Sequence, residues 1–248
     1  MSIVKKLTLG FRPGNRAFRV ESMRGLLIDT LMDARGSALP ETFYTLIADP
    51  SPAGVVSLMD QEQGNILYVD RDNVVITRDV YKKQNGNIDL EAAFGDFKRV
   101  WGVIQGVLKL DNIRRIGIVA EHRYKASGDG SSDLISKITR LPVHDYPANF
   151  TLQFESRTHS GKGKLDAAKG AFTNCIYQIY DSAIDATAPA EGFINSNFDY
   201  QTYYSPLINT KNVTEEMERH FFAFKRELVK FNSEMDGLGL KGNGAKQK

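Results

Sequence analysis

The chain has 248 residues, of which 42% are hydrophobic and 25% charged, as in a typical folded globular protein. Its formal net charge of +2 is too small to indicate a nucleic-acid partner by itself, and no apolar run is long enough to predict a membrane helix. A single cysteine, Cys175, excludes an internal disulfide and is typical of a reducing compartment, so we expect a cytoplasmic protein with no membrane association.

The first part of the chain reads as an opening strand, a short helix and a β-meander. Residues 3–11 predict the strand, and Ser22 is a candidate cap for a helix that extends to about Arg35. Polar turn residues separate four further short apolar runs, which predict strands at 43–48, 55–59, 66–69 and 74–80.

A long amphipathic helix is predicted from Asp89 to about Leu110. Its apolar residues repeat at intervals of three and four, which places one continuous seam along the helix: Phe94, Phe97, Trp101, Ile104 and Leu108. The following residues, 113–124, alternate between apolar and polar side chains and predict a central strand.

The second part of the chain shows a similar order of elements. A short helix is expected around 134–141, followed by strands at 150–155, 172–184 and 193–204. The last helix has an apolar seam from Met217 to Met235, with Asn212 and Glu215 suited to a capping box and Gly237 suited to its end.

These elements predict an α+β fold in which antiparallel sheets are each packed by a long amphipathic helix, with two similar halves as one hypothesis. We expect an N-terminal α+β half over 1–126, a C-terminal α+β half over 127–236, and a disordered tail over 237–248. Alternatively, the Met217–Met235 seam packs against a second copy of the chain and makes a homo-oligomer.

No motif in the sequence predicts a cofactor, a metal centre or a catalytic set. The four histidines fall on separate predicted elements without metal-ligand spacing. We expect His220 at the surface or boundary of the last helix, and His122 in a structural role. Cys175 lies in an apolar, aromatic strand and is expected to be unreactive.

The nearest pattern to an enzyme site is Asp145 followed by Glu155 and Arg157. A metal-dependent nuclease needs two carboxylates to hold its ion and a lysine to assist them. Arginine occupies the position where the lysine is required. A nuclease is therefore an alternative rather than the main prediction.

Two groups of residues are candidates for binding another macromolecule. Basic residues cluster around the long helix and the central strand, where they offer a surface for phosphates or an acidic protein: Lys98, Arg99, Arg114, Arg115 and Arg123. The second group consists of Tyr200, Tyr203 and Tyr204, because tyrosine is enriched at interfaces. Ordinary surface and strand roles are the alternative interpretation of both groups.

Residues 72–81, the long helix and Ile113–Ile118 follow one another in a succession of strand, tyrosine, helix and R-R-I-G-I. This succession resembles a sporadically distributed family of uncharacterised prokaryotic proteins, in which the strand after the helix reads R-I-G-L-R-Y. Residues 197–200 and the last helix are similar to the closing part of that family. The resemblance implies the architecture and transfers no catalytic residue.

The sequence thus predicts a non-enzymatic interaction protein that binds a protein partner. A metal-dependent nuclease and a nucleic-acid-binding protein that uses a basic surface are the alternatives.

Overall fold

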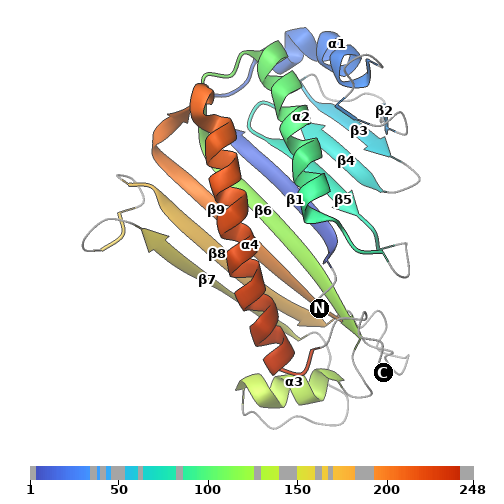
Figure 1. Ribbon diagram of the computed structural model, residues 1–248, viewed down its shortest axis with the longest axis vertical. Helices are drawn as coiled ribbons and strands as arrows, with labels where there is room; N and C mark the ends of the chain where they lie inside the picture. Colours follow the sequence, from blue (N-terminus) through green and yellow to red (C-terminus); the bar gives the residue numbers. More distant parts are fainter. Residues whose placement is uncertain are drawn as a thin grey trace.

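A single antiparallel sheet dominates the computed structural model (Figure 1). The structure describes residues 4–33, 38–39, 43–45, 54–60, 64–81, 86–125, 130–139, 150–159, 164–166, 170–181 and 193–240. Within them, nine strands lie in the order β2-β3-β4-β5-β1-β6-β9-β8-β7. Every neighbouring pair of strands is antiparallel.

The strands of the first part form a meander whose last strand returns beside β1. They are β1 (Val4–Pro13), β2 (Phe43–Thr45), β3 (Val56–Asp60), β4 (Asn65–Val69) and β5 (Val74–Asp79). A tight turn joins β4 to β5, because one carboxylate oxygen of Asp70 accepts hydrogen bonds from the backbone N–H groups of Asp72 (2.7 Å) and Asn73 (2.6 Å).

The strands of the second part extend the same sheet. They are β6 (Asn112–Lys125), β7 (Thr151–His159), β8 (Phe172–Asp181) and β9 (Phe193–Asn209). β6 pairs with β1 on one edge and with β9 on the other. The structure therefore differs from the expected arrangement of separate sheets on either side of residue 126, because β6 joins the strands of both parts into one layer.

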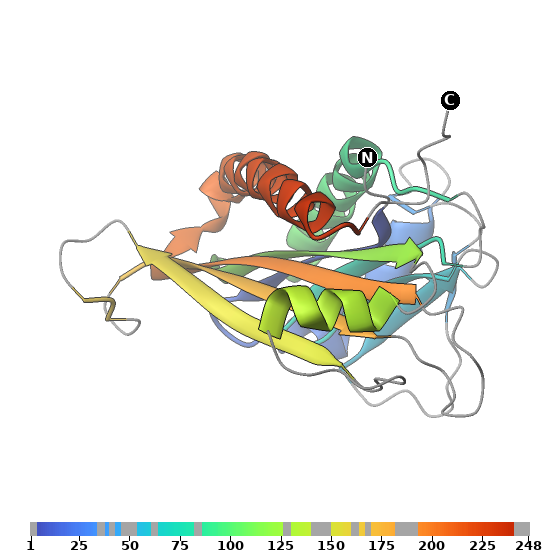
Figure 2. The same cartoon turned by 90° about the horizontal axis from the view of Figure 1, so that it is seen from below.

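The helices are α1 (Arg19–Met32), α2 (Leu90–Leu108), α3 (Gly130–Thr139) and α4 (Val213–Gly237), with a 3-10 turn, η1 (Thr210–Asn212), before α4. Figure 2 shows α2 and α4 on the same side of the sheet, whereas Figure 1 shows α3 at one end of it. The two long predicted helices are confirmed. None of the described helices is long and apolar enough to cross a membrane.

The apolar seams of α2 and α4 are buried between these helices and the sheet. Phe94 of α2 stacks on Phe221 of α4 with ring centroids 4.1 Å apart, and Phe11 of β1 meets Trp101 of α2 edge-on at 4.3 Å. Met217 and Met235 are both at most 2% exposed. The seam of α4 is thus filled by the chain itself, which is incompatible with the alternative that it packs against a second copy.

The ends of the helices differ in part from the prediction. The side chain of Asp89 caps α2 by accepting from the backbone N–H groups of Glu91 and Ala92. The expected capping box of α4 is absent, since the side chain of Asn212 makes no capping hydrogen bond. α4 ends at Gly237 as predicted, but Leu240, which we expected in a disordered tail, is buried. Residues 241–248 lie outside the described residues.

Candidate functional site

The two faces of the sheet have different surroundings. Alternate residues of β6 from Ile116 to Tyr124 are buried beneath the helices. The intervening residues, from Arg115 to Arg123, are partly exposed on the opposite side. We call this opposite side the open face, because no described helix lies over it (Figure 2). An antiparallel sheet with one solvated face commonly shows this alternation.

One end of the open face carries a hydrogen-bonded group that we call the Arg115 cluster: Arg115, Asp199, Gln201 and Tyr203. The guanidinium of Arg115 donates to Gln201 Oε1 (3.4 Å) and lies 3.3 Å from the hydroxyl of Tyr203, which itself donates to Gln201 Oε1 at 2.7 Å. The Arg115 guanidinium also lies 5.6 Å from the ring centroid of Tyr203. The ring of Tyr203 also stacks on the ring of Phe172 of β8, with ring centroids 4.6 Å apart.

Asp199 is the acidic member of the Arg115 cluster. Burial raises the pKa of its carboxyl to about 6, while the hydrogen bond from Gln201 and the charge of Arg115 oppose that rise. One of its oxygens accepts from the side-chain amide of Gln201, and the other has no hydrogen-bond partner. The cluster therefore contains a carboxyl that titrates closer to neutral pH than an ordinary aspartate.

The other end of the open face carries a second group, the Arg123 cluster: Tyr81, Glu121, Arg123 and Tyr180. The guanidinium of Arg123 lies 5.6 Å from the ring centroid of Tyr81, and the hydroxyl of Tyr81 donates to Glu121. Burial, followed by the contact with Glu121, raises the pKa of the Tyr81 hydroxyl. The pKa of Tyr180 is raised for the same two reasons. Both tyrosines are consequently neutral hydrogen-bond donors at physiological pH.

The open face carries no side chains next to the Arg115 cluster, where two glycines of β1 and β6 face each other. Gly10 of β1 stands directly opposite Gly117 of β6. A Cβ atom at Gly10 would lie 3.1 Å from the carbonyl oxygen of Val74, so a larger residue is disfavoured there. Arg115 and Arg123 are eight residues apart on one strand, which corresponds to about 27 Å at the usual rise per residue.

The structure separates the basic residues that the sequence analysis grouped together. Arg115 and Arg123 lie on the open face, but Lys98 and Arg99 belong to α2 on the other side of the sheet. Lys98 pairs with Glu218 of α4 at 2.9 Å, and Arg99 pairs with Asp96. Arg114 lies at an irregularity in the pairing of β6 with β9 and donates to the backbone oxygen of Gly14.

The three candidate tyrosines also divide between the two faces. Tyr203 belongs to the open face, whereas Tyr200 is only 7% exposed and contacts His220 and Phe224 of α4. Tyr204 is on the same side as Tyr200, and burial raises the pKa of its hydroxyl. Only Arg115, Arg123 and Tyr203, among the predicted binding residues, therefore share the open face. Sequence reasoning missed Tyr81, Glu121 and Gln201, which hold them in place.

Among the described residues, no group of three or more His, Cys, Asp or Glu side chains is arranged to hold a metal. Asp145 lies outside the described residues, and Glu155 is engaged by Arg157 (2.7 Å) and by the amide of Asn174 (3.3 Å), which together lower the pKa of its carboxyl. Cys175 is half-buried, and burial raises the pKa of its thiol. That environment fits an unreactive cysteine.

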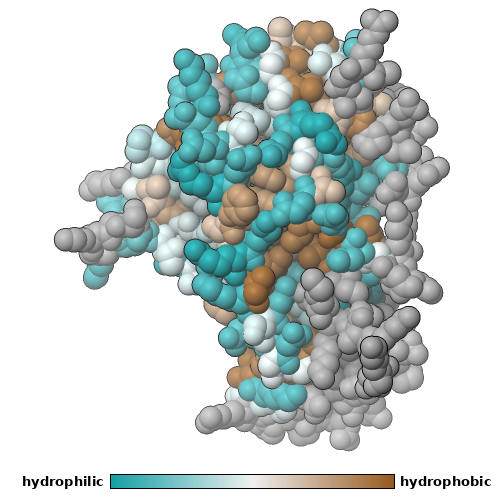
Figure 3. Space-filling view, in the orientation of Figure 1, coloured by the Kyte–Doolittle hydropathy of each residue, from teal (hydrophilic) through white to brown (hydrophobic). Residues whose placement is uncertain are grey.

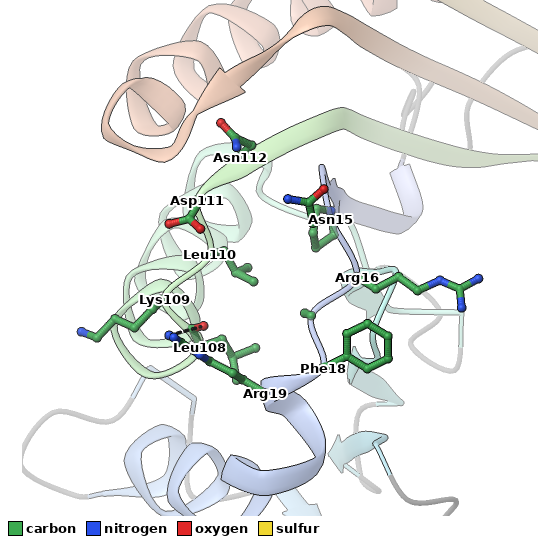
Figure 4. Close-up of a pocket in the computed structure, with 11 residues that line it drawn as sticks. Asn15, Arg16, Phe18, Arg19, Leu108, Lys109, Leu110, Asp111 and Asn112 are labelled. Carbon is green, nitrogen blue, oxygen red and sulfur yellow. Dashed lines mark hydrogen bonds between the residues drawn. The ribbon is translucent and has the colours of Figure 1, made fainter.

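The helix side of the molecule offers a less organised surface. Figure 3, which views that side, shows hydrophilic and hydrophobic residues interspersed over it. A pocket of about 210 Å³ lies where the start of α1 meets the end of α2. In Figure 4, Arg16 and Lys109 point away from this pocket, and Arg19 turns to the carbonyl oxygen of Leu108 (3.4 Å). The pocket therefore has little inward-facing charge, and the open face is the stronger candidate.

Comparison with known proteins does not indicate a function for this chain. No protein-family model matches the chain, and no curated protein matches it in sequence.

Proposed function

We propose that this protein is a non-enzymatic interaction protein that binds a protein partner through the open face of its sheet. The observation that carries the proposal is the pair of arginine–tyrosine contacts at the two ends of the face, Arg115 with Tyr203 and Arg123 with Tyr81. Arginine and tyrosine are over-represented among the residues that dominate binding energy at protein interfaces.

Both contacts are organised before any partner binds. Gln201 accepts hydrogen bonds from Arg115 and Tyr203, while Glu121 accepts from Tyr81. Side chains that are already held in one arrangement lose less conformational entropy on binding than free ones do. The clusters therefore suit a recognition surface better than a set of unconstrained surface cations would.

The charge distribution of the open face favours a protein over a nucleic acid. Lys6 stands between Asp79 and Glu121 in the register of the sheet, and Arg157 pairs with Glu155. A nucleic-acid backbone is bound by Lys and Arg side chains that neutralise its phosphates, so anions that already pair with these cations weaken such a site. A protein surface, in contrast, presents both signs of charge.

One end of the open face is more cationic than the rest. Arg12 of β1 stands directly opposite Arg115 of β6. These two arginines fit an acidic side chain of the partner, since guanidinium groups bind carboxylates in a bidentate geometry. We therefore expect the partner to place an aspartate or glutamate at this end.

The order of elements supports the hypothesis of two similar halves. Among the described residues, the first part runs strand, helix, four strands and long helix, and the second runs strand, helix, three strands and long helix. Their strand orders mirror each other outward from the central β1–β6 pair. In this interpretation each half contributes one central strand to the open face. The cytoplasmic location and the resemblance to a prokaryotic family stay predictions from the sequence.

The proposal is tested by reversing the charge of the two open-face arginines. We expect the variant Arg115→Glu/Arg123→Glu to lose the partner that the wild-type protein captures from its native host, with at least tenfold weaker binding once that partner is purified. The matched control is Arg99→Glu, which reverses an exposed arginine on the opposite layer and should bind as the wild type does.

Three results would replace this proposal. Equal loss of binding in Arg99→Glu would place the interface on the helix side. Tight binding of a DNA or RNA duplex that weakens steeply with salt and disappears in Arg115→Glu/Arg123→Glu would identify a nucleic-acid partner instead. Nuclease activity with Mg²⁺ that is lost in Glu155→Gln would establish the enzymatic alternative.

A further inference from the structure

The outer backbone edge of the strand β7 is a surface separate from the Arg115 and Arg123 clusters. Its nine residues pair with β8 without interruption, from Thr151 opposite Tyr180 to His159 opposite Phe172. On its other side, no strand among the described residues pairs with it. An edge of this kind presents a row of backbone N–H and C=O groups that can accept a further strand.

Several of the usual protections of an edge strand are missing from β7. Its sequence, TLQFESRTH, contains no proline, glycine or lysine, and its register with β8 has no bulge. Natural edge strands are commonly blunted by such features. Most of its side chains are exposed, including Phe154 at 52%, so a neighbouring strand meets little obstruction from β7 itself.

The charges of β7 are complementary to those of a second β7. Glu155 and Arg157 lie on either side of Ser156 and form an ion pair with each other at 2.7 Å. If two copies of the strand run antiparallel about Ser156, Glu155 of each copy stands directly opposite Arg157 of the other. Opposite charges at directly opposed positions stabilise an antiparallel pair, and like charges destabilise it.

We propose that β7 pairs antiparallel with β7 of a second copy of this chain, with the two Ser156 residues at the centre. Such an interface is isologous and therefore closes as a dimer. The two nine-stranded sheets become one continuous sheet, and both open faces point to the same side because directly opposed residues of paired strands share a face. The dimer then offers two partner-binding surfaces side by side, which allows bivalent binding.

Charge reversal along β7 tests the proposal in solution. We expect the wild-type protein to have about twice the 27.7 kDa mass of one chain by light scattering. The single variants Glu155→Arg and Arg157→Glu place like charges opposite each other and should weaken the dimer at least tenfold. The double variant Glu155→Arg/Arg157→Glu restores the complementarity and should restore the dimer. Arg219→Glu, an exposed reversal on α4, is the control that should change nothing.

A cysteine cross-link tests the register itself. In a Cys175→Ser background, which removes the thiol of β8 that stands opposite Ser156, Ser156→Cys should oxidise to a disulfide-linked dimer. Directly opposed residues of antiparallel strands have Cα atoms about 4.5–5.5 Å apart, within the range that a disulfide spans. Thr158→Cys lies on the same face but is displaced from the centre, so it should remain unlinked.

A wild-type protein that stays monomeric at the highest concentration measured would overturn the proposal. So would a dimer that is unaffected by the single reversals and forms no cross-link at position 156. Neither result bears on partner binding through the Arg115 and Arg123 clusters, which uses other residues and is tested by other variants.

Discussion

At the scale of single residues, two buried histidines, one on β6 and one on α4, lie between α4 and the sheet. His122 of β6 is fully buried, and neither ring nitrogen has a hydrogen-bond partner. His220 of α4 is 4% exposed, with Nδ1 3.0 Å from the hydroxyl of Thr202 and Nε2 3.2 Å from the carbonyl oxygen of Tyr200. Burial lowers the pKa of His122 to about 4 and that of His220 to about 3. Both side chains are therefore neutral in the folded protein at neutral pH.

The lowered pKa of His122 makes stability depend on pH. In the unfolded chain this histidine takes up a proton near its ordinary pKa of 6.5, but in the folded chain only near 4. The unfolded state thus binds more protons as the pH falls from 6.5 towards 4, and stability is lost over that window. Between pH 7 and 5, His122 alone lowers the free energy of unfolding by about 2 kcal/mol.

His122→Leu removes this contribution and also the unpaired ring nitrogens. We expect the variant to be at least as stable as the wild type at pH 7 and to lose about 2 kcal/mol less on acidification to pH 5. Urea denaturation of both proteins at the two pH values measures the difference. Asp199, whose raised pKa has the opposite effect on acidification, is present in both proteins and cancels. An identical pH dependence in the two proteins would show that His122 is not buried as described.

The sequence indicated the role of His122 better than that of His220. We expected a structural His122, but placed His220 at a surface or boundary. The structure shows His220 in the buried seam of α4, three residues after Met217. Its two hydrogen-bond partners come from β9, and no feature of the local sequence of α4 indicates them.

At the scale of secondary-structure elements, the long helices were the most predictable part of the chain. The seam of α2 and the seam of α4 appear in the sequence as uninterrupted intervals of three and four, and the structure buries both. Helix ends were less predictable, because they depend on local hydrogen bonds. α1 begins at Arg19, three residues before the predicted cap at Ser22, whose hydroxyl instead donates to the backbone oxygen of Arg19.

Two phenylalanines of α4 form a matched pair for testing the seam. Phe224 is fully buried and stacks on Phe198 of β9, whereas Phe222 is 64% exposed. We expect Phe224→Ala to lower the free energy of unfolding by about 3–5 kcal/mol, through lost burial and a residual cavity. Phe222→Ala should change it by about 0.5 kcal/mol or less. Urea denaturation measures both variants, and equal losses would contradict the position of α4 on the sheet.

At the scale of the whole molecule, the single sheet could not be read from the sequence. Alternation along residues 113–124 correctly predicts a strand, but it contains no information about which strands lie on either side. β6 pairs with β9, so that Tyr124 stands opposite Ile194 across a separation of 70 residues in the chain. Pairings of this kind depend on the assembled core and not on local pattern.

The same limit explains the outcome for the candidate site. Clustering along the sequence grouped Arg99 with Arg115, although the helix–strand connection places them on opposite layers. Alternation along β6 separates Arg115 and Arg123 from the buried residues, but only the assembled layers show that their side is open. Tyr81, which contacts Arg123, comes from the connection between β5 and α2, and Gln201, which contacts Arg115, comes from β9. Both are distant in sequence from the arginines that they hold.

Site-specific photo-crosslinking in the native host tests most directly which side of the molecule the partner covers. A photoreactive residue in place of Val119, at the centre of the open face, should form an adduct with a distinct protein, and one in place of Phe222, on the helix side, should not. Adducts from position 222 with none from position 119 would contradict the account.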